Sequence, residues 1–279
     1  MKKLFAVIGD PIGHSMSPVM HNDLFSFYQI DATYVPFQVK SEDLQDVMKG
    51  LKAMGVGGFN VTVPHKSAII PFLDEVDELA ARIGAVNTVV NENGRLKGYN
   101  TDGPGFLEGL KTHISTVAGK KVLIIGAGGA ARAIYFTLAK EKPLAIDMAN
   151  RTIEKAEQLI ADCPYTVSST ALSLAEAGKN SGEYDLIVQT TLIGMAPKTA
   201  EQPLQLSSIK NQSLICDIIY NPLATKFLTA AKEKGASVQN GIDMFVYQGA
   251  LAFEKWTGVF PDVQRMRANV LKQLGGNPC

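Results

Sequence analysis

The segment GFNVTVPHK, residues 58–66, carries three polar side chains that could hold an oxygen-rich small molecule. Alternation along NVTV places the Asn60 amide and the Thr62 hydroxyl on one side of a short strand, and the two valines on the other side, toward a core. Lys66 precedes a helical pattern, where the helix dipole disfavours a cation. The alternative is an ordinary edge strand with a solvated face. We hypothesise that the amide, the hydroxyl and the amine grip one ligand.

Further polar side chains gather where other strands are expected to end. Ser15 and Ser17 follow the first strand-like run in GDPIGHSMSP, although Ser17-Pro18 also fits the N-cap and first residue of a helix. Asn87 begins one strand-like run and Asp102 ends the next in AVNTVVNENGRLKGYNTDG, where the alternative is a hairpin with polar ends. Because α/β folds bind ligands at strand ends, we expect these side chains to contribute to one site.

The strongest motif is KKVLIIGAGGAARAIYFTLAK, in which a continuous apolar run is followed by a glycine-rich turn and a helical pattern. Gly126 permits the tight turn, Gly128 allows the backbone to approach a pyrophosphate, and Ala131 packs the helix on the strand. The free N–H groups at the helix start would bind phosphate oxygens. The alternative is a glycine turn that binds no nucleotide, but the context favours a dinucleotide site.

The next strand-like run, PLAIDMANRT, indicates which dinucleotide binds. NAD sites present an acidic residue at the end of this strand, whereas NADP sites use a nearby arginine for the 2′-phosphate. Here the run ends in Asn150-Arg151-Thr152, one cation flanked by two neutral hydrogen-bonding groups. Asp147 is the counter-argument, but it lies three residues inside the strand. The sequence therefore favours NADP.

Two α/β domains are expected to carry these side chains. The first hundred residues alternate strand-like runs with helical patterns, which predicts a mostly parallel sheet: KLFAVIG, TYVPFQV, GFNVTV and VNTVVNENGRLKGYNTD alternate with SPVMHNDLFSFYQ, SEDLQDVMKGLKAM and PFLDEVDELAARIG. After Gly119 a βαβ pattern restarts with KKVLIIG, PLAIDMANR, YDLIVQTT and SLICDIIY, which predicts a second α/β domain. Two amphipathic patterns, GIDMFVYQGALAFEKW and PDVQRMRANVLKQLGG, are expected to return to the first domain.

The Gly-Pro-Gly tripeptide at 103–105 is a loop signal before a short helix, and we place a hinge there. The predicted domains are a substrate-binding and catalytic domain over 1–103, a Rossmann-type NADP domain over 104–240, and C-terminal helices over 241–279.

Composition excludes several classes of partner. The chain has 279 residues, 46% of them hydrophobic, and balances 27 Lys and Arg against 27 Asp and Glu, which leaves no charge footprint for nucleic acid or an anionic membrane. No apolar run approaches the roughly 20 residues of a membrane-spanning helix, and no signal peptide is recognised at the start, so a cytoplasmic protein with a small-molecule partner is expected. The three cysteines lack CxxC spacing and the four histidines form no HExxH pair, so neither disulfides nor a metal site are predicted: Cys163, Cys216, Cys279, His14, His21, His65 and His113.

Eight motifs, in order and spacing, resemble the shikimate dehydrogenase family from the start of the chain to about Gly258: GDPIGHSMSP, NVTVPHK, AVNT, GYNTDG, GAGGAARA, NRT, DIIYNPLAT and GIDMFVYQGALAFEKWTG. The resemblance implies NADP-dependent interconversion of 3-dehydroshikimate and shikimate, on the chorismate route to the aromatic amino acids. It also implies a substrate domain built from both ends of the chain around a Rossmann-type domain. Hydride would pass between the nicotinamide and the substrate, while protein groups handle the proton.

The resemblance assigns residues to these roles. Lys66 and Asp102 match the catalytic pair, since an ammonium beside a carboxylate can hydrogen-bond the reacting oxygen and exchange its proton. The positions matched to substrate binding are Ser15, Ser17, Asn60, Thr62, Lys66, Asn87, Asp102, Tyr220 and Gln248. The positions matched to the NADP site are Gly126, Ala127, Gly128, Gly129, Ala130, Ala131, Asn150, Arg151 and Thr152, with Thr191, Ile219, Gly241 and Met244 nearer the nicotinamide.

The sequence departs from the family pattern at Gln189-Thr190-Thr191-Leu192, where the family more often has Asn-Ala-Thr-Ser. One alternative function is a quinate/shikimate dehydrogenase with broader substrate or cofactor use. Another is a non-catalytic NADP-binding sensor, although a sensor need not retain both Lys66 and Asp102. A monomer or a homodimer is compatible with the sequence.

Overall fold

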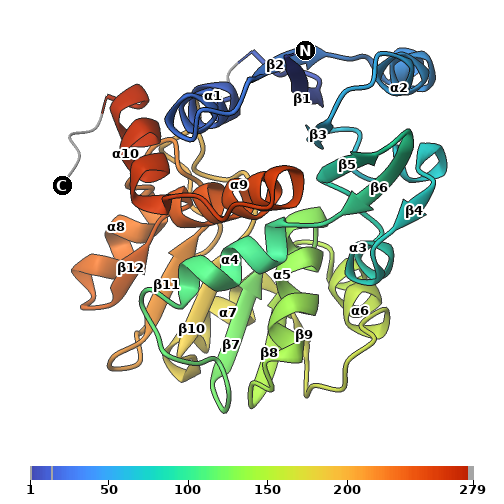
Figure 1. The fold of residues 1–279 in the computed structure, drawn as a ribbon. Coiled ribbons are helices and arrows are strands. Elements are labelled where there is room, and N and C mark those ends of the chain that lie inside the picture. Colours follow the sequence, from blue (N-terminus) through green and yellow to red (C-terminus); the bar gives the residue numbers. More distant parts are fainter. Residues whose placement is uncertain (1, 14, 276–279) are drawn as a thin grey trace. The chain divides into compact units, whose positions relative to one another are not determined.

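The computed structural model describes residues 2–13 and 15–275, and its chain divides into two compact units. Unit 1 comprises Met1–Thr101 and Val246–Cys279, and unit 2 comprises Asp102–Phe245. Each unit contains one six-stranded sheet (Figure 1). The boundary between Phe245 and Val246 lies inside helix α9 (Ile242–Thr257).

The sheet of unit 1 has the strand order β2-β1-β3-β5-β6-β4. Its strands are β1 (Lys3–Gly9), β2 (Ala32–Gln38), β3 (Gly58–Val61), β4 (Glu75–Val76), β5 (Thr88–Glu92) and β6 (Arg95–Tyr99). Only β5 runs against its neighbours among these strands, so the expected mostly parallel sheet is confirmed. The β5–β6 hairpin turns at Asn93 and Gly94, which have φ values of 55° and 88° and so suit an Asn-Gly turn.

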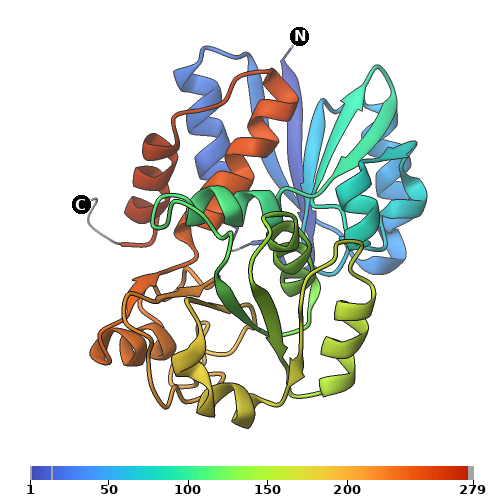
Figure 2. The ribbon, with the colours of Figure 1, turned by 90° about the horizontal axis from the view of Figure 1, so that it is seen from below.

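Helices cover both faces of this sheet. They are α1 (Ser17–Phe27), α2 (Leu44–Ala53), α3 (Glu78–Ile83), α10 (Val263–Gln273), the larger part of α9, and the 3₁₀ turns η1 (Ser41–Asp43) and η2 (Ile70–Phe72). Met48 of α2 and Ala80 of α3 belong to the core on one face. On the other face α1 lies beside α10 (Figure 2), and Phe25 of α1 stacks on Phe5 of β1 at 5.1 Å between ring centroids.

The prediction of one helix over PFLDEVDELAARIG is wrong for its first part, and only α3 is helical. Leu73 is extended, and the two residues of β4 pair with β6, so long-range pairing replaces the helical pattern there. Asp77 begins α3 by accepting a hydrogen bond from the Leu79 amide, and Gly84 ends it with a φ of 71°. The six-residue helix therefore has strong signals at both ends.

Strand β3 ends at Val61, two residues earlier than the alternation predicted. Val61 is 2% exposed, but Val63 is 66% exposed, so its assignment to the core was wrong. The amide of Thr62 still donates to the Ile8 carbonyl, whereas the amide of His65 donates back to the Thr62 carbonyl and turns the chain out of the sheet. Val63 lies in this turn.

Unit 2 contains a fully parallel sheet with the order β12-β11-β10-β7-β8-β9. Its strands are β7 (Lys121–Ile125), β8 (Ala145–Ala149), β9 (Ala171–Leu172), β10 (Leu186–Gln189), β11 (Leu214–Asp217) and β12 (Ser237–Gln239). This is the strand order of a dinucleotide-binding Rossmann domain. Strands β8 and β9 are added on one side of β7, and strands β10, β11 and β12 are added on its other side. The predicted Rossmann-type domain is confirmed.

The helices of unit 2 are α4 (Asp102–Leu110), α5 (Gly129–Lys140), α6 (Ile153–Ala161), α7 (Leu174–Lys179), α8 (Lys226–Glu233) and the 3₁₀ turn η3 (Ser181–Glu183). Ala177 of α7 and Phe227 of α8 pack on one face of the sheet together with Leu123 of β7. Helices α7 and α8 and strands β9 and β12 were not predicted, because each is too short for a clear periodic pattern.

The loop predicted at 103–105 is wrong, because α4 begins at Asp102 and includes these residues. Gly103 permits the close approach of α4 to α5, which Figure 1 shows crossing each other in unit 2. A Cβ atom at Gly103 would lie 2.1 Å from Oγ1 of Thr137 and 2.4 Å from the Ala133 carbonyl oxygen. The glycine serves helix packing, and Pro104 is tolerated in the first helical turn.

Within the described ranges, no helix combines the length and apolar character needed to cross a membrane. The same residues contain no group of three or more His, Cys, Asp or Glu side chains placed to hold a metal ion. His14 and Cys279, for which no metal or disulfide role is predicted, lie outside the described residues.

Candidate functional site

A network of buried polar side chains crosses the strands of unit 1. The Tyr34 hydroxyl donates to Oδ1 of Asn60 over 2.7 Å. The Asn60 amide nitrogen donates to Oγ1 of Thr88 and to the Asn87 carbonyl, each at 3.1 Å. Asn60 is 8% exposed, and these three bonds determine which end of its amide is the oxygen.

Asn87 continues the network to the end of β6. Its Oδ1 accepts from the Thr101 backbone amide at 2.8 Å, and its Nδ2 donates to Oγ1 of Thr101 at 3.0 Å. The Asn87 backbone amide donates to the Tyr99 carbonyl. Asn87 and Thr101 are almost fully buried, so this end of the network lies in the interior of unit 1.

Lys66 lies in a turn that is bonded to the chain just before Asn87. The Val86 amide donates to the Lys66 carbonyl at 2.8 Å, and the Ser67 hydroxyl donates to the Gly84 carbonyl at 2.8 Å. The first helical turn after Lys66 is η2, which is three residues long and starts four residues later. The expected position at a helix start was therefore wrong, since no helix dipole of useful length acts on the ammonium.

Ser15, Ser17 and Thr62 also lie in unit 1. Ser17 is the first residue of α1, Met16 is the N-cap, and the Ser17 amide donates to Oγ of Ser15 at 3.3 Å. The expectation that Ser17 is the N-cap was wrong, because Met16 holds that position and Ser17 is already the first helical residue, with a buried side chain. Burial raises the pKa of Tyr34 well above its ordinary value.

In unit 2 most of the predicted cofactor residues follow four neighbouring strands that end in register, whereas Gly241 and Met244 follow β12. Ile125 of β7 lies opposite Ala149 of β8 and Gln189 of β10, and Gln189 lies opposite Asp217 of β11. Gly126, Asn150, Thr191 and Ile219 therefore come one or two residues after strands that stop at the same edge. This is the edge at which parallel α/β sheets bind ligands.

The glycine-rich turn between β7 and α5 fits a dinucleotide phosphate. Gly126 has a φ of 113°, and a Cβ there would lie 2.5 Å from Oγ1 of Thr190. The N-cap Gly128 provides no side-chain cap, and a Cβ at Gly128 or Gly129 would meet nothing within 4 Å. The start of α5 thus borders open space, as a bound pyrophosphate requires. Ala127, Ala130 and Ala131 complete the turn with side chains no larger than a methyl group.

A hollow of about 290 Å³ borders this turn. It is lined by Ala127, Gly128, Gly129, Arg132, Lys155, Gln158 and Leu159. Lys155 was not predicted, although its place three residues after Thr152 at the start of α6 is a usable signal for a second cation. Arg132 forms an ion pair with Asp162 at 2.6 Å.

The end of β8 carries the residues predicted to select the nucleotide. Asn150 donates to the Thr152 carbonyl at 2.8 Å, and Arg151 and Thr152 are exposed. Asp147 is only 7% exposed, and its carboxylate accepts from the Thr170 amide at 3.0 Å and from the Tyr184 hydroxyl at 2.9 Å. These bonds hold the Asp147 carboxylate in the interior of unit 2, so the strand end lacks the acidic group that NAD sites use.

Internal hydrogen bonds and a ring contact hold the loops after β10 and β11. Gln189 donates to the carbonyls of Thr191 and Ile193 at 3.0 and 3.1 Å and accepts from the Thr191 amide, so the residue that departs from the family pattern organises this loop. The Gly241 amide donates to the Ile219 carbonyl at 2.9 Å. The rings of Tyr220 and Phe245 lie 4.9 Å apart.

Buried Asp217 supports the loop after β11. Its carboxylate accepts from the Ile219 amide at 3.0 Å and from the Thr225 hydroxyl at 2.8 Å, while burial raises its pKa to about 6. Met244 and Gln248 are half-buried residues of α9, the former in unit 2 and the latter in unit 1. The predicted site residues thus divide between the units: the substrate set lies in unit 1, except Asp102 and Tyr220, and the cofactor set lies in unit 2.

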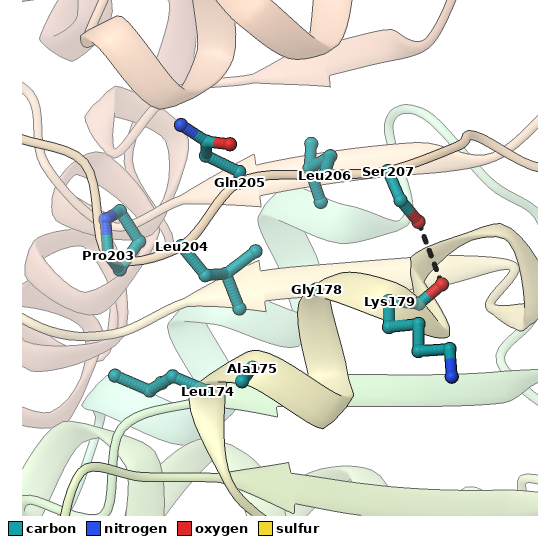
Figure 3. A pocket seen from close by; sticks show the side chains of 9 residues that line it. All are labelled: Leu174, Ala175, Gly178, Lys179, Pro203, Leu204, Gln205, Leu206 and Ser207. Atoms are coloured by element: carbon teal, nitrogen blue, oxygen red, sulfur yellow. Dashed lines mark hydrogen bonds between the residues drawn. The ribbon is translucent and has the colours of Figure 1, made fainter.

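A second hollow in unit 2, of about 380 Å³, lies between α7 and the segment 203–207 (Figure 3). Leu174, Leu204 and Leu206 contribute apolar side chains to it, and the Ser207 hydroxyl donates to the Lys179 carbonyl at 2.7 Å. None of the predicted site residues lines this hollow.

Comparisons with known proteins agree along the chain. Residues 7–89 match the family described as the shikimate dehydrogenase substrate binding domain, 108–220 match shikimate / quinate 5-dehydrogenase, and 241–271 match the shikimate 5′-dehydrogenase C-terminal domain. The chain is 58% identical over 277 residues to the shikimate dehydrogenase (NADP⁺) of Bacillus cereus, covering 99% of this chain and 100% of the relative.

Two solved structures have the same fold over nearly the whole chain. The shikimate 5-dehydrogenase of Thermus thermophilus, in complex with NADP(H) and shikimate, has a TM-score of 0.88 and 36% identity, covering 97% of this chain and 99% of that one. The enzyme of Listeria monocytogenes, in complex with shikimate and NAD, has a TM-score of 0.91 and 34% identity, covering 96% of both chains.

Proposed function

This chain belongs to the shikimate dehydrogenase family, and we propose that Lys66 and Asp102 serve its oxidoreductase reaction, the NADP-dependent interconversion of shikimate and 3-dehydroshikimate. The reaction is a step on the route through chorismate to the aromatic amino acids. The observation that carries the residue assignment is the buried network of unit 1, in which Asn60, Asn87 and Thr101 join the ends of three strands through hydrogen bonds.

The network supports the assignment through preorganisation. Neutral amides and hydroxyls suit a ring that carries several hydroxyl groups, because each can donate to or accept from a substrate oxygen. Groups held by buried hydrogen bonds also reject an analogue that lacks the matching partner. Ser15, Ser17, Thr62, Tyr220 and Gln248 are proposed as further substrate contacts.

Lys66 and Asp102 are proposed as the proton-transferring pair. In the oxidation of shikimate, the C–H bond of the carbinol carbon breaks with loss of a hydride, and the hydroxyl proton must be removed at the same time. The Lys66 amine can accept this proton or stabilise the developing alkoxide, and the Asp102 carboxylate can orient the hydroxyl. In the reverse direction the same groups return the proton to the oxygen.

The glycine-rich turn and the end of β8 are proposed to hold the cofactor. NADP, when bound, supplies the hydride acceptor or donor. The open amides at the start of α5 would bind its pyrophosphate, and Arg151 would pair with its 2′-phosphate, assisted by Asn150 and Thr152. Lys155, which lines the adjoining hollow, adds a second positive charge for these phosphates. The loops that contain Thr191, Ile219, Gly241 and Met244 are proposed to lie against the nicotinamide.

Steady-state oxidation of shikimate tests this function. Purified protein is given shikimate or quinate, each with NADP⁺ or NAD⁺, and reduced nicotinamide is followed by absorbance. We expect turnover with shikimate and NADP⁺ to exceed the other three combinations. Equal turnover of quinate would assign the broader quinate/shikimate activity. Measurable NADP⁺ binding without turnover of either substrate would favour the non-catalytic sensor.

We also propose that the protein works in the cytoplasm, because its described cysteines, Cys163 and Cys216, are free thiols and a reducing compartment keeps thiols unpaired. Localisation of a fluorescent fusion in cells tests this compartment. The proposed oligomeric state is a monomer or a homodimer, and size-exclusion chromatography with light scattering distinguishes them.

A further inference from the structure

Tyr34 is a buried tyrosine whose hydroxyl bonds to one predicted substrate residue, Asn60. It belongs to β2, and its side chain is 1% exposed. The hydroxyl has one proton, which it donates to Oδ1 of Asn60 over 2.7 Å. This bond determines which way the buried Asn60 amide faces.

The ring of Tyr34 is held from several sides. It stacks on His21 of α1 with ring centroids 4.6 Å apart and an interplanar angle of 28°, and it lies 5.9 Å from Trp256 of α9. Its backbone is fixed by Asn22, whose side chain both donates to the Tyr34 carbonyl and accepts from the Tyr34 amide at 2.8 Å. The hydroxyl position is consequently determined by packing rather than by the substrate.

The bonds have a consistent direction through the network. Because the Asn60 nitrogen donates to Thr88 and to the Asn87 carbonyl, its oxygen must be the atom that accepts from Tyr34. Removing the tyrosine hydroxyl would leave this buried oxygen without its donor. The Asn60 side chain could then take other orientations, which weakens the binding of a ligand that needs it.

We propose that Tyr34 is a positioning residue for the substrate, acting through Asn60 without touching the reacting atoms. This role rests on the proposed shikimate dehydrogenase function. It differs from a general structural role in a specific way: the loss of the hydroxyl should weaken shikimate binding and leave NADP⁺ binding to unit 2 unchanged.

The test compares Tyr34→Phe with the unaltered enzyme and with Tyr135→Phe. Tyr135 is the matched control, since it is also 1% exposed and its hydroxyl bonds to Ser169 at 2.7 Å, outside the predicted site. Tyr34→Phe should raise the KM for shikimate about tenfold, the factor that corresponds to a buried polar group left without its partner. The KM for NADP⁺ should stay within about twofold, and kcat should change less than the shikimate KM. Tyr135→Phe should change neither KM.

A second variant tests the hydroxyl itself. p-Aminophenylalanine in place of Tyr34 has an amino group that can donate to Asn60, so it should return the shikimate KM toward the unaltered value. A parallel rise in both KM values for Tyr34→Phe, or no rise in either, would overturn the role of Tyr34, as would a failure of the amino group to restore binding. Absence of shikimate turnover in the unaltered enzyme would instead remove the proposed function, and this role with it.

Discussion

His21 makes the stability of unit 1 depend on pH in a way that one substitution can isolate. The side chain is fully buried in α1, and neither ring nitrogen has a hydrogen-bond partner. Its ring neighbours are Tyr34, Phe253 and Trp256, none of which carries a carboxylate that could stabilise an imidazolium. Burial therefore lowers the pKa of His21 from its ordinary value of 6.5 to about 3.

The sign of the effect follows from proton binding. In the folded chain His21 stays neutral down to about pH 3, whereas in the unfolded chain its pKa is the ordinary 6.5. Below pH 6.5 the unfolded state binds a proton that the folded state does not, so stability falls as the pH falls toward 3. At about 1.4 kcal/mol per pH unit, the loss between pH 6.5 and 5.0 is about 2 kcal/mol.

Urea unfolding of the unaltered protein and of His21→Phe, each at pH 7.5 and pH 5.0, measures this loss. Trp256, the single tryptophan of the chain, lies 5.2 Å from His21 and reports the unfolding of unit 1 by fluorescence. The variant conserves most of the side-chain volume, so at pH 7.5 its free energy of unfolding should lie within about 1.5 kcal/mol of the unaltered value. On going to pH 5.0 the unaltered protein should lose about 2 kcal/mol more than the variant. An equal loss in both proteins would refute the reasoning, as would a His21 pKa near 6.5 measured by NMR.

Three further predictions concern the site and the helix packing. Lys66→Ala should lower kcat by about 10²- to 10⁴-fold with little change in the shikimate KM, because the amine acts on charge that develops during reaction; unchanged turnover would remove Lys66 from the mechanism. Arg151→Ala should weaken NADP⁺ binding by about tenfold or more while NAD⁺ binding changes little, and titration calorimetry with both nucleotides measures the difference. Equal weakening would show that Arg151 does not read the 2′-phosphate. Gly103→Ala should destabilise unit 2 by about 1–3 kcal/mol in urea unfolding, because the added methyl overlaps Thr137 and the Ala133 carbonyl. The control Gly50→Ala, in a helix where a Cβ meets nothing within 4 Å, should be stabilising by up to about 1 kcal/mol.

Some features of this protein could be predicted from adjacent residues alone. The continuous apolar run of β7, the glycine turn and α5 form one stretch of sequence, so backbone preference and periodicity were enough to predict them. The same holds for β1, whose predicted and observed bounds coincide. The order of eight short motifs was enough to identify the family, because each motif is itself local.

The contacts that organise the candidate site depend on the tertiary structure. Tyr34 and Asn60 are 26 residues apart, and no local pattern indicates that the tyrosine hydroxyl reaches the amide. Long-range pairing likewise placed part of an expected helix in β4. The close packing of α4 on α5 leaves no room for a side chain at position 103. Local sequence determines which backbone conformations are favourable, whereas the partner of a buried polar group is determined by which distant strands and helices exclude water around it. For this chain, sequence alone was enough to predict the chemical groups and the family, and only the packed structure decided how Asn60 and Asn87 are held.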